Sequence, residues 1–153
     1  MKNFVLLTML LFVGFTACQR NEEVIKEKVE KEVVKTHKDG LFVHISTNEA
    51  RKVLMGLSIA NKMLPSSDVI VFIDAEAINV TIKDGEVYQM DGYEASSVEL
   101  MQKLTKAGVK IMVCPMCLKS FGKTEADLLE GLEIAKGENF FGFTKGRIMT
   151  LDY

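Results

Sequence analysis

The sequence has little of several residues on which particular protein classes depend. Its 153 residues include three cysteines, two prolines and two histidines. An odd number of cysteines cannot close into a complete disulfide framework, so a small disulfide-stabilised fold is excluded. Lysine and arginine number 19 against 21 acidic residues, and no basic block breaks this balance, so nucleic acid is disfavoured as a partner. A composition of 48% hydrophobic and 26% charged residues is instead typical of one α/β domain.

The first 17 residues lack the length of a membrane-spanning helix. Lys2 precedes an apolar run of about 15 residues, whereas a helix needs roughly 20 to cross a bilayer. Small residues then lead to Cys18. This order predicts a signal peptide over residues 1–17. Residues 15–18, FTAC, resemble a bacterial lipobox, which implies lipidation of Cys18 and a cell-envelope protein anchored to a membrane that faces the periplasm or the cell surface. Ordinary cleavage that leaves Cys18 as a free thiol is the alternative.

Residues 18–39 are dominated by charged side chains of both signs. Because these charges nearly cancel and are well solvated, we interpret the segment as a tether that holds the following domain off the membrane. Ile25, Val29 and Val33 recur every four residues. A short surface helix that associates with another copy through this stripe is the alternative.

Residues 40–153 alternate between apolar runs and amphipathic stretches, which predicts one domain. The expected strands are 41–45, 68–73, 109–113 and 147–151, with 77–82 as a further extended piece. The expected helices are 50–63 after a Ser46 cap, a second from Ser96 or Ser97 to the stop at Gly108, and 125–136 after a Thr124 cap. Strands that alternate with helices imply a three-layer α/β/α fold with a mostly parallel sheet.

Cys114 and Cys117 form a CxxC pair at the carboxyl end of the third expected strand. Sites in parallel α/β sheets lie beyond the carboxyl ends of strands. Backbone N–H groups near a helix start lower the pKa of a thiol, and the thiolate is its reactive form. The second thiol can then close an intramolecular disulfide. We therefore predict that both cysteines take part in chemistry; a structural pair, either buried thiols or a static disulfide, is the alternative.

Thioredoxin-like exchange is the first function that a CxxC pair suggests. That fold carries its CxxC early in the chain and faces it with a downstream cis-proline. The two prolines are Pro65 and Pro115, and neither follows Cys117. The sequence therefore argues against a thioredoxin-like domain.

The histidine count argues against structural zinc. Such a site needs four ligands, commonly two CxxC-type pairs or added histidines, and the only histidines are His37, in the tether, and His44, in the first expected strand. Met112 and Met116 add soft thioethers beside the cysteines, which makes Cu(I) binding an alternative. Packing is the more ordinary role of such methionines.

Three other polar residues are candidates of lower specificity. His44 lies on an apolar strand and is expected to be a hydrogen-bonded core or loop-edge histidine, with a role in the site as the alternative. Asp74 and Glu76 follow the second strand and could reach Cys114, although a helix-capping or solvent-exposed pair is the favoured interpretation. No glycine-rich phosphate loop, nucleophile-elbow serine or HExxH helix is present, so hydrolases and nucleotide-binding proteins are disfavoured.

The order of elements over residues 41–151 resembles the DsrE/DsrF-like family of small sulfur-relay proteins. The most specific part runs from Ala107-Gly108 through the third strand and Cys114 to Gly122 and the Asp-Leu pair at 127–128. The resemblance implies a three-layer α/β/α fold and homo-oligomers, often trimers or hexamers. It also implies a cysteine after the corresponding strand that accepts and passes on a persulfide.

Cys114 matches that position, and Cys117 is a resolving or second acceptor thiol. Relay members are cytoplasmic, single-cysteine subunits of hetero-oligomers, whereas this chain is predicted to be exported, lipidated and equipped with two thiols. The sequence thus predicts an exported sulfur carrier or thiol-redox protein, with no organic cofactor and with a donor or acceptor protein as partner. A non-catalytic oligomeric binding module and a Cu(I)-binding periplasmic protein are the alternatives.

Overall fold

Five parallel strands form one sheet in the order β4-β3-β2-β1-β5. The computed structural model describes residues 37–153. The predicted signal peptide, Cys18 and the tether up to residue 36 lie outside the described residues, so these predictions stay predictions. Within the described part, no helix combines the length and the apolar character that crossing a membrane requires.

The elements of the sheet and its connections have the following bounds. The strands are β1 (Asp39–Ile45), β2 (Ser67–Ile73), β3 (Lys110–Val113), β4 (Leu132–Ile134) and β5 (Ile148–Asp152). The α-helices are α2 (Ala50–Met63), α3 (Ser97–Lys106) and α4 (Pro115–Ser120). The 3₁₀ helices are η1 (Ala75–Val80), η2 (Glu125–Asp127) and η3 (Gly137–Asn139). The predicted α/β class with a parallel sheet is confirmed.

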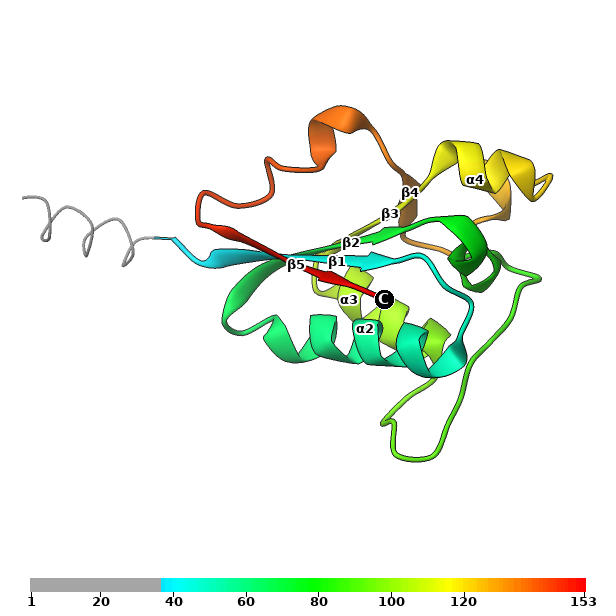
Figure 1. Ribbon diagram of the computed structural model, residues 1–153, viewed down its shortest axis with the longest axis horizontal. Coiled ribbons are helices and arrows are strands. Elements are labelled where there is room, and N and C mark those ends of the chain that lie inside the picture. Colours follow the sequence, from blue (N-terminus) through cyan, green and yellow to red (C-terminus); the bar gives the residue numbers. More distant parts are fainter. Residues whose placement is uncertain (1–36) are drawn as a thin grey trace, which may run out of the picture. The chain divides into compact units, whose positions relative to one another are not determined.

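Helices α2 and α3 cover one face of the sheet (Figure 1). Alternate strand residues such as Leu41, Val43 and Ile45 point to this face and are at most 3% exposed. They pack against buried helix residues that include Leu54 and Leu104. Each such side chain contributes about 1.5–3 kcal/mol through burial, so this layer supplies most of the core.

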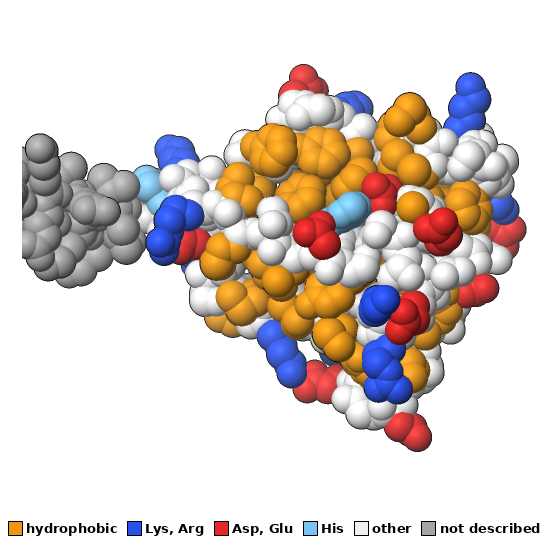
Figure 2. Space-filling model, in the orientation of Figure 1, with side chains coloured by type: hydrophobic (Ala, Val, Ile, Leu, Met, Phe, Trp, Pro, Cys, Tyr) orange, Lys and Arg blue, Asp and Glu red, His pale blue; other side chains and the backbone are white. Residues whose placement is uncertain are grey.

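The other face of the sheet is covered by residues 135–147, which we call the covering segment (Figure 1). Its only regular element is η3. Phe140 and Phe141 stack over Phe42 of β1 at ring-centroid distances of 6.0 and 6.4 Å, and Phe140 meets Phe72 of β2 edge-on at 5.0 Å. Figure 2 shows hydrophobic side chains gathered over this segment, and Phe141 is 69% exposed. An aromatic loop therefore forms the third layer.

The prediction of an extended piece at 77–82 is wrong. Residues 75–80 form η1, in which the Ala77 N–H donates to the Asp74 carbonyl and the Thr81 N–H to that of Ile78. Ala77, Ile78 and Val80 are fully buried. A short apolar run that is buried on every side has no periodicity that distinguishes a strand from a helix. The sequence pattern therefore gave no basis for choosing between the two here.

The prediction of a helix over 125–136 is also wrong. Thr124 does cap a turn there, in a capping box with Asp127, but η2 ends at once. Gly131 has a φ of +86°, and a Cβ at this position would lie 3.0 Å from Thr105 of α3. Only glycine adopts this conformation at low cost, so the chain turns here and continues as the short strand β4 beside β3.

Two other helix caps were predicted besides Thr124, and one of them is correct. Ser96 caps α3 in a capping box with Glu99. The Ser46 cap is wrong, because α2 begins after Glu49, which makes no side-chain cap. The Ser46 N–H and hydroxyl instead both donate to the carbonyl of Tyr153, at 2.9 and 3.2 Å. Ser46 therefore holds the carboxyl end of the chain.

Candidate functional site

Cys114 lies between strand β3 and helix α4. Its N–H donates to the carbonyl of Ile73 at 3.0 Å, which continues the sheet pairing by one residue. Its side chain is the N-cap of α4, where the sulfur accepts a hydrogen bond from the Cys117 N–H at 3.4 Å. Pro115 occupies the first helical position, where its missing N–H costs nothing. The CxxC sequence itself therefore builds the turn that brings both cysteines together.

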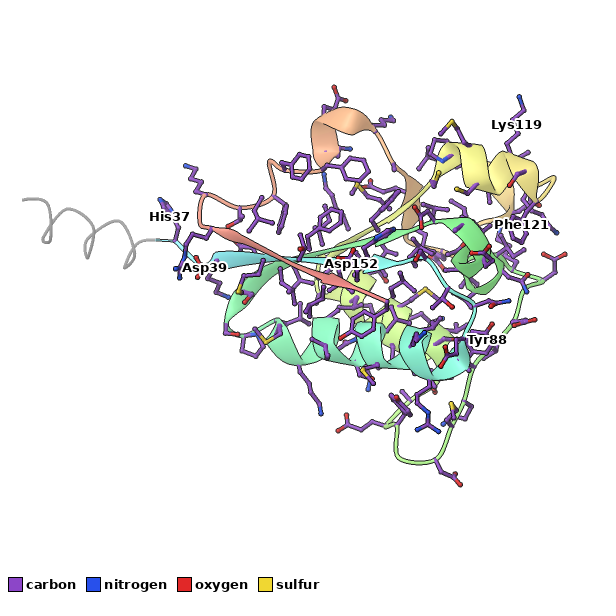
Figure 3. The ribbon with its side chains drawn as sticks, in the orientation of Figure 1. His37, Asp39, Tyr88, Lys119, Phe121 and Asp152 are labelled. Atoms are coloured by element: carbon purple, nitrogen blue, oxygen red, sulfur yellow. The ribbon has the colours of Figure 1, made fainter. Side chains whose placement is uncertain are left out.

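Both cysteines are free thiols in this structure. Cys114 is 8% exposed, whereas Cys117 is half-buried. Within α4, Met116 is 79% exposed and Phe121 just beyond it 43%. Figure 3 places Phe121 and Lys119 at the end of the molecule away from Asp39. The exposed side chains of this region thus lie on α4 and just beyond it, next to the cysteine pair.

Hydrogen bonding to Cys114 holds the pKa of the Cys117 thiol above its ordinary value of 9.0. Partial burial raises this pKa further, as do the charges of Cys114 and Asp74. A hydrogen bond from the Ala75 N–H to the Cys117 sulfur opposes these effects. Cys117 is therefore a thiol at neutral pH, and its S–H is available as a donor to the sulfur of Cys114.

Ala75 occupies a strained position beside the cysteines. Its φ is +45°, the only positive φ of a non-glycine residue among those described. An L-residue in this left-handed region costs free energy, and such strain clusters at functional sites. Here the conformation turns the chain out of β2 into η1, the 3₁₀ helix that leads away from the carboxyl end of the strand.

His44 joins two carboxylates at the same edge of the sheet. Its Nε2 lies 3.0 Å from Asp74 Oδ1, and its Nδ1 lies 2.9 Å from Asp152 Oδ1. The imidazole also stacks on Phe72 at a centroid distance of 5.5 Å. The three residues come from the carboxyl ends of β1, β2 and β5, so parallel strands assemble the group. His44 is thus hydrogen-bonded, as expected, near the end of β1.

One row of residues runs across the outer face of the sheet beneath this site. The row takes one residue from each strand, and neighbouring residues are paired in register. From β5 to β4 these residues are Asp152, His44, Phe72, Met112 and Glu133. Because side chains alternate along a strand, Asp74 and Cys114 are the next positions on this same face. His44, its two carboxylate partners and Cys114 therefore lie on the same face of the sheet.

Sequence reasoning missed three residues of this region. Asp152 follows an expected strand, a position that the rule on carboxyl ends could have found. Ala75 carries no signal in its residue type. Glu133 lies on β4, which was not expected, and its Oε1 is buried without a hydrogen-bond partner. Of the two acidic candidates, Asp74 joins the site, whereas Glu76 is exposed beyond it.

The residues considered for a metal do not gather around one point. Among residues 37–153, no three histidine, cysteine, aspartate or glutamate side chains are placed to hold a metal ion together. Met112 is fully buried in the sheet, whereas Met116 faces solvent on α4. The two thioethers therefore lie in different surroundings.

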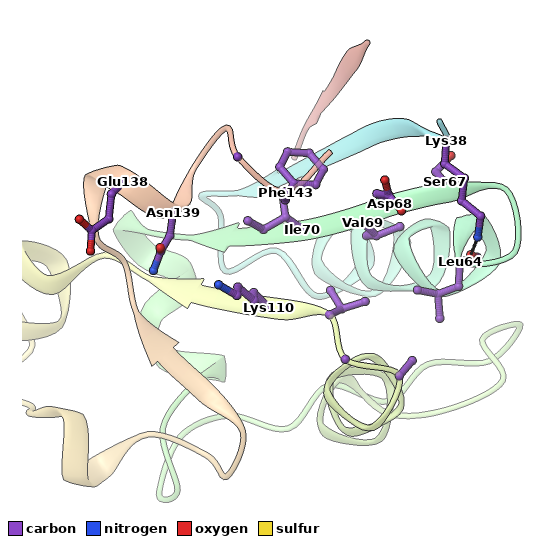
Figure 4. A pocket seen from close by; sticks show the side chains of 14 residues that line it. Lys38, Leu64, Ser67, Asp68, Val69, Ile70, Lys110, Glu138, Asn139 and Phe143 are labelled. Carbon is purple, nitrogen blue, oxygen red and sulfur yellow. Dashed lines mark hydrogen bonds between the residues drawn. The ribbon is translucent and has the colours of Figure 1, made fainter. Parts of the chain in front are cut away.

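A cavity of about 450 Å³ lies at the amino ends of β2 and β3 (Figure 4). Ser67, Ile70 and Lys110 line it together with Phe143 and Glu138 of the covering segment. The cysteines are at the opposite ends of these strands and do not line it. Because parallel α/β sheets place their sites at the carboxyl ends, we take the cysteine pair, and not this cavity, as the candidate functional site.

The sequence of residues 39–145 matches the model of the DsrE/DsrF-like family. The chain belongs to this family. Membership supports a sulfur-relay type of function in general terms. No curated protein matches this family member in sequence.

Two solved structures are similar to this DsrE-like chain. The crystal structure of the YchN protein from E. coli superimposes with a TM-score of 0.57 at 16% identity, over 76% of this chain and 100% of YchN. A protein of unknown function from Methanobacterium thermoautotrophicum gives 0.50 at 22% identity, over 65% of this chain and 82% of its own. At these identities the similarity establishes the fold alone.

Proposed function

We propose that this protein is a sulfur carrier that stores sulfane sulfur as a persulfide on Cys114, with Cys117 as the second thiol. One observation carries the proposal. The Cys114 sulfur sits at the carboxyl end of an inner strand and accepts the Cys117 N–H at 3.4 Å, in a chain of a sulfur-relay type of family. This contact places the second thiol residue directly beside the sulfur that is proposed to hold the persulfide.

Loading is a thiolate displacement. The Cys114 thiolate attacks the terminal sulfur of a small persulfide or polysulfide, a new S–S bond forms, and the S–S bond to the donor breaks. The donor leaves as its thiolate, and Cys114 carries the sulfur as –S–SH. No net oxidation of the pair occurs, because one sulfane sulfur moves from donor to carrier. The N–H and S–H of Cys117 support the charge on Cys114.

Unloading follows one of two routes. A thiolate of an acceptor protein takes the terminal sulfur and leaves Cys114 as a thiolate. Alternatively, Cys117 attacks the inner sulfur of the Cys114 persulfide, closes the Cys114–Cys117 disulfide and releases hydrosulfide. The second route oxidises the pair, so a thiol reductant must restore it.

The proposal includes the cellular localisation of the protein and its oligomeric state. The sequence of residues 1–18 supports export and a lipid anchor at Cys18, so the carrier works at a membrane of the cell envelope. Family resemblance supports a homo-oligomer, trimeric or hexameric. The edge strand β5 exposes Ile148 and Met149, at 37% and 44%, which is consistent with a further protein surface there.

Intact-mass spectrometry of the reduced chain after exposure to polysulfide tests the proposal. We expect wild type and Cys117→Ser to gain increments of about 32 Da, the mass of one sulfur atom, and Cys114→Ser to gain none. Because the carrier needs Cys114 alone for storage, Cys117→Ser is the matched control. Equal loading of Cys114→Ser and wild type would contradict the assignment.

A binding or assembly module with a structural disulfide is the second candidate. The burial of Cys114 and its capping of α4 favour it, because both are structural tasks. The mass of the unreduced protein separates the candidates. A Cys114–Cys117 disulfide that mild thiol reductants leave intact supports the module, whereas free or persulfidated thiols support the carrier. Copper retained through desalting would instead support the Cu(I)-binding alternative.

A further inference from the structure

The covering segment presents aromatic rings to solvent on the outer face of the sheet. The ring centroids of Phe140 and Phe141 are 6.1 Å apart, and both rings stack on Phe42 of β1. Phe141 is 69% exposed, and the other two rings and Phe72 are half-buried. We call these four residues the aromatic patch. Contiguous apolar surface of this kind marks a site of contact with another protein or with a membrane.

The same segment carries an excess of positive charge, although the whole chain has a net charge of −2. It contains three basic residues, Lys136, Lys145 and Arg147, and one acidic residue, Glu138. Arg147 pairs with Asp39, whereas neither lysine forms an ion pair in the described part of the chain. Exposed aromatic rings flanked by basic side chains are typical of surfaces that bind membranes with anionic lipids.

The chain enters the domain beside this segment. Thr144 Oγ1 donates to the Lys38 carbonyl at 2.8 Å, and the Gly40 N–H donates to the carbonyl of Arg147 at 2.7 Å. Roughly 20 residues separate Lys38 from the predicted lipid anchor at Cys18, and such a stretch reaches at most about 70 Å even when fully extended. An anchored chain therefore keeps this surface within reach of the bilayer, where even a surface of low intrinsic affinity binds.

We propose that the covering segment is a membrane-docking surface. Phe141 inserts into the headgroup region of the bilayer that holds the anchor, and the lysines of the segment contact the headgroups of anionic lipids. This inference rests on the proposed localisation of the carrier and not on its sulfur chemistry. The tether that separates the domain from the membrane also allows it to return.

The charges on this face of the sheet give the docked domain an orientation. Arg147 precedes β5 and pairs with Asp39 at the amino end of β1, and Lys145 lies two residues earlier. Asp74 and Asp152 lie at the carboxyl ends of β2 and β5. Anionic headgroups attract the first group and repel the second. The cysteine pair, which lies at the carboxyl ends, is therefore left open to partner proteins.

The test uses tryptophan as a reporter, because the chain contains none. Phe141→Trp puts a single fluorophore on the aromatic patch. Phe121→Trp puts one beyond α4, at the end of the molecule away from Asp39 (Figure 3), and is the matched control because Phe121 is also exposed, at 43%. The mature chain from residue 18 carries Cys18→Ser, so that no lipid is attached. It is mixed with vesicles of phosphatidylcholine, with or without phosphatidylglycerol.

With the anionic vesicles, we expect the emission of Phe141→Trp to shift to shorter wavelength and to be quenched by brominated lipid, because the ring enters the interface. Phe121→Trp should show neither change. In co-sedimentation with these vesicles, Phe141→Ser should weaken binding about tenfold, the loss of one apolar ring. Lys145→Gln should weaken it about fivefold, the effect of one basic residue near a charged surface. Added salt should weaken it too.

An unshifted Phe141→Trp with anionic vesicles would overturn the inference, and so would equal responses of the two tryptophan variants. A shift that depends on protein concentration and not on lipid, with dimers in sedimentation equilibrium, would assign the patch to contact between copies of this chain and would also overturn it. The assay involves no sulfur donor. Failure to dock therefore leaves the sulfur carrier intact, and a docked chain that never acquires a persulfide would refute the carrier alone.

Discussion

Replacement of Ala75 by glycine should leave the protein as stable as wild type or slightly more stable. The left-handed conformation of Ala75, with its φ of +45°, costs an L-residue about 1–2 kcal/mol, which glycine does not incur. Against this gain, glycine adds about 0.4–1 kcal/mol of unfolded-state entropy, and part of the contribution of one half-buried methyl group is lost. The expected net change in the free energy of unfolding is about 0 to +1 kcal/mol.

Ala77 is the matched control, two residues further along the same 3₁₀ helix. It is fully buried and its φ is negative. Ala77→Gly loses about 0.8 kcal/mol for the buried methyl and about 0.5–1 kcal/mol for glycine in a helix, so we expect a loss of about 1.3–1.8 kcal/mol. The two substitutions remove the same atoms and should differ by about 2 kcal/mol.

Urea unfolding followed by circular dichroism measures this difference, since the chain has no tryptophan for fluorescence. Equal losses for Ala75→Gly and Ala77→Gly would refute the assignment of strain to Ala75. The alkylation rate of Cys117 provides a second readout. Because the backbone N–H remains in place in Ala75→Gly, this rate should stay close to that of wild type.

Three further outcomes are expected. Ser96→Ala removes the N-cap of α3 and should cost about 1 kcal/mol in urea unfolding; a loss below the error would contradict the capping box. Burial and a hydrogen bond to Glu86 raise the pKa of Tyr88 to about 12, so ultraviolet titration should show one late-ionising tyrosine that Tyr88→Phe removes and Glu86→Gln shifts down. A late step that persists in Tyr88→Phe would be a contradiction. Hydrogen bonds from Arg147 hold the pKa of Asp39 below its ordinary 3.8, so this pair stabilises the fold above that pH and the stabilisation is lost as the pH falls through the lowered value. Asp39→Asn should therefore flatten the acid limb of a plot of Tm against pH, and parallel limbs would refute this.

The local sequence pattern was sufficient to predict those helices and strands whose residues follow one clear periodicity. Helix α2 has its predicted bounds, and β1 and β2 begin within two residues of theirs, because apolar runs and an amphipathic stretch follow one another. The predictions for residues 77–82 and 125–136 were wrong, because the secondary structure of these segments depends on tertiary contacts. In the second segment, Gly131 packs closely against Thr105 of α3, and the chain then continues as strand β4. The local sequence does not predict this contact.

The site was predictable to a similar extent. The rule that sites follow the carboxyl ends of strands located Cys114 and Cys117 at the end of β3, and Asp74 at the end of β2. The contact between His44 and Asp152 could not be derived, because it joins residues 108 positions apart. It depends on β5 returning across the sheet to pair with β1, and strand order is not encoded in any local pattern.

The most direct test of the sulfur-carrier account is to locate the added sulfur in the wild-type chain. The reduced protein is exposed to polysulfide, the free thiols are blocked, and fragment spectra of the peptide that contains both cysteines locate the increment of about 32 Da. The account predicts the increment on Cys114, with Cys117 recovered as a blocked thiol. An increment confined to Cys117, or none on either cysteine, would contradict it.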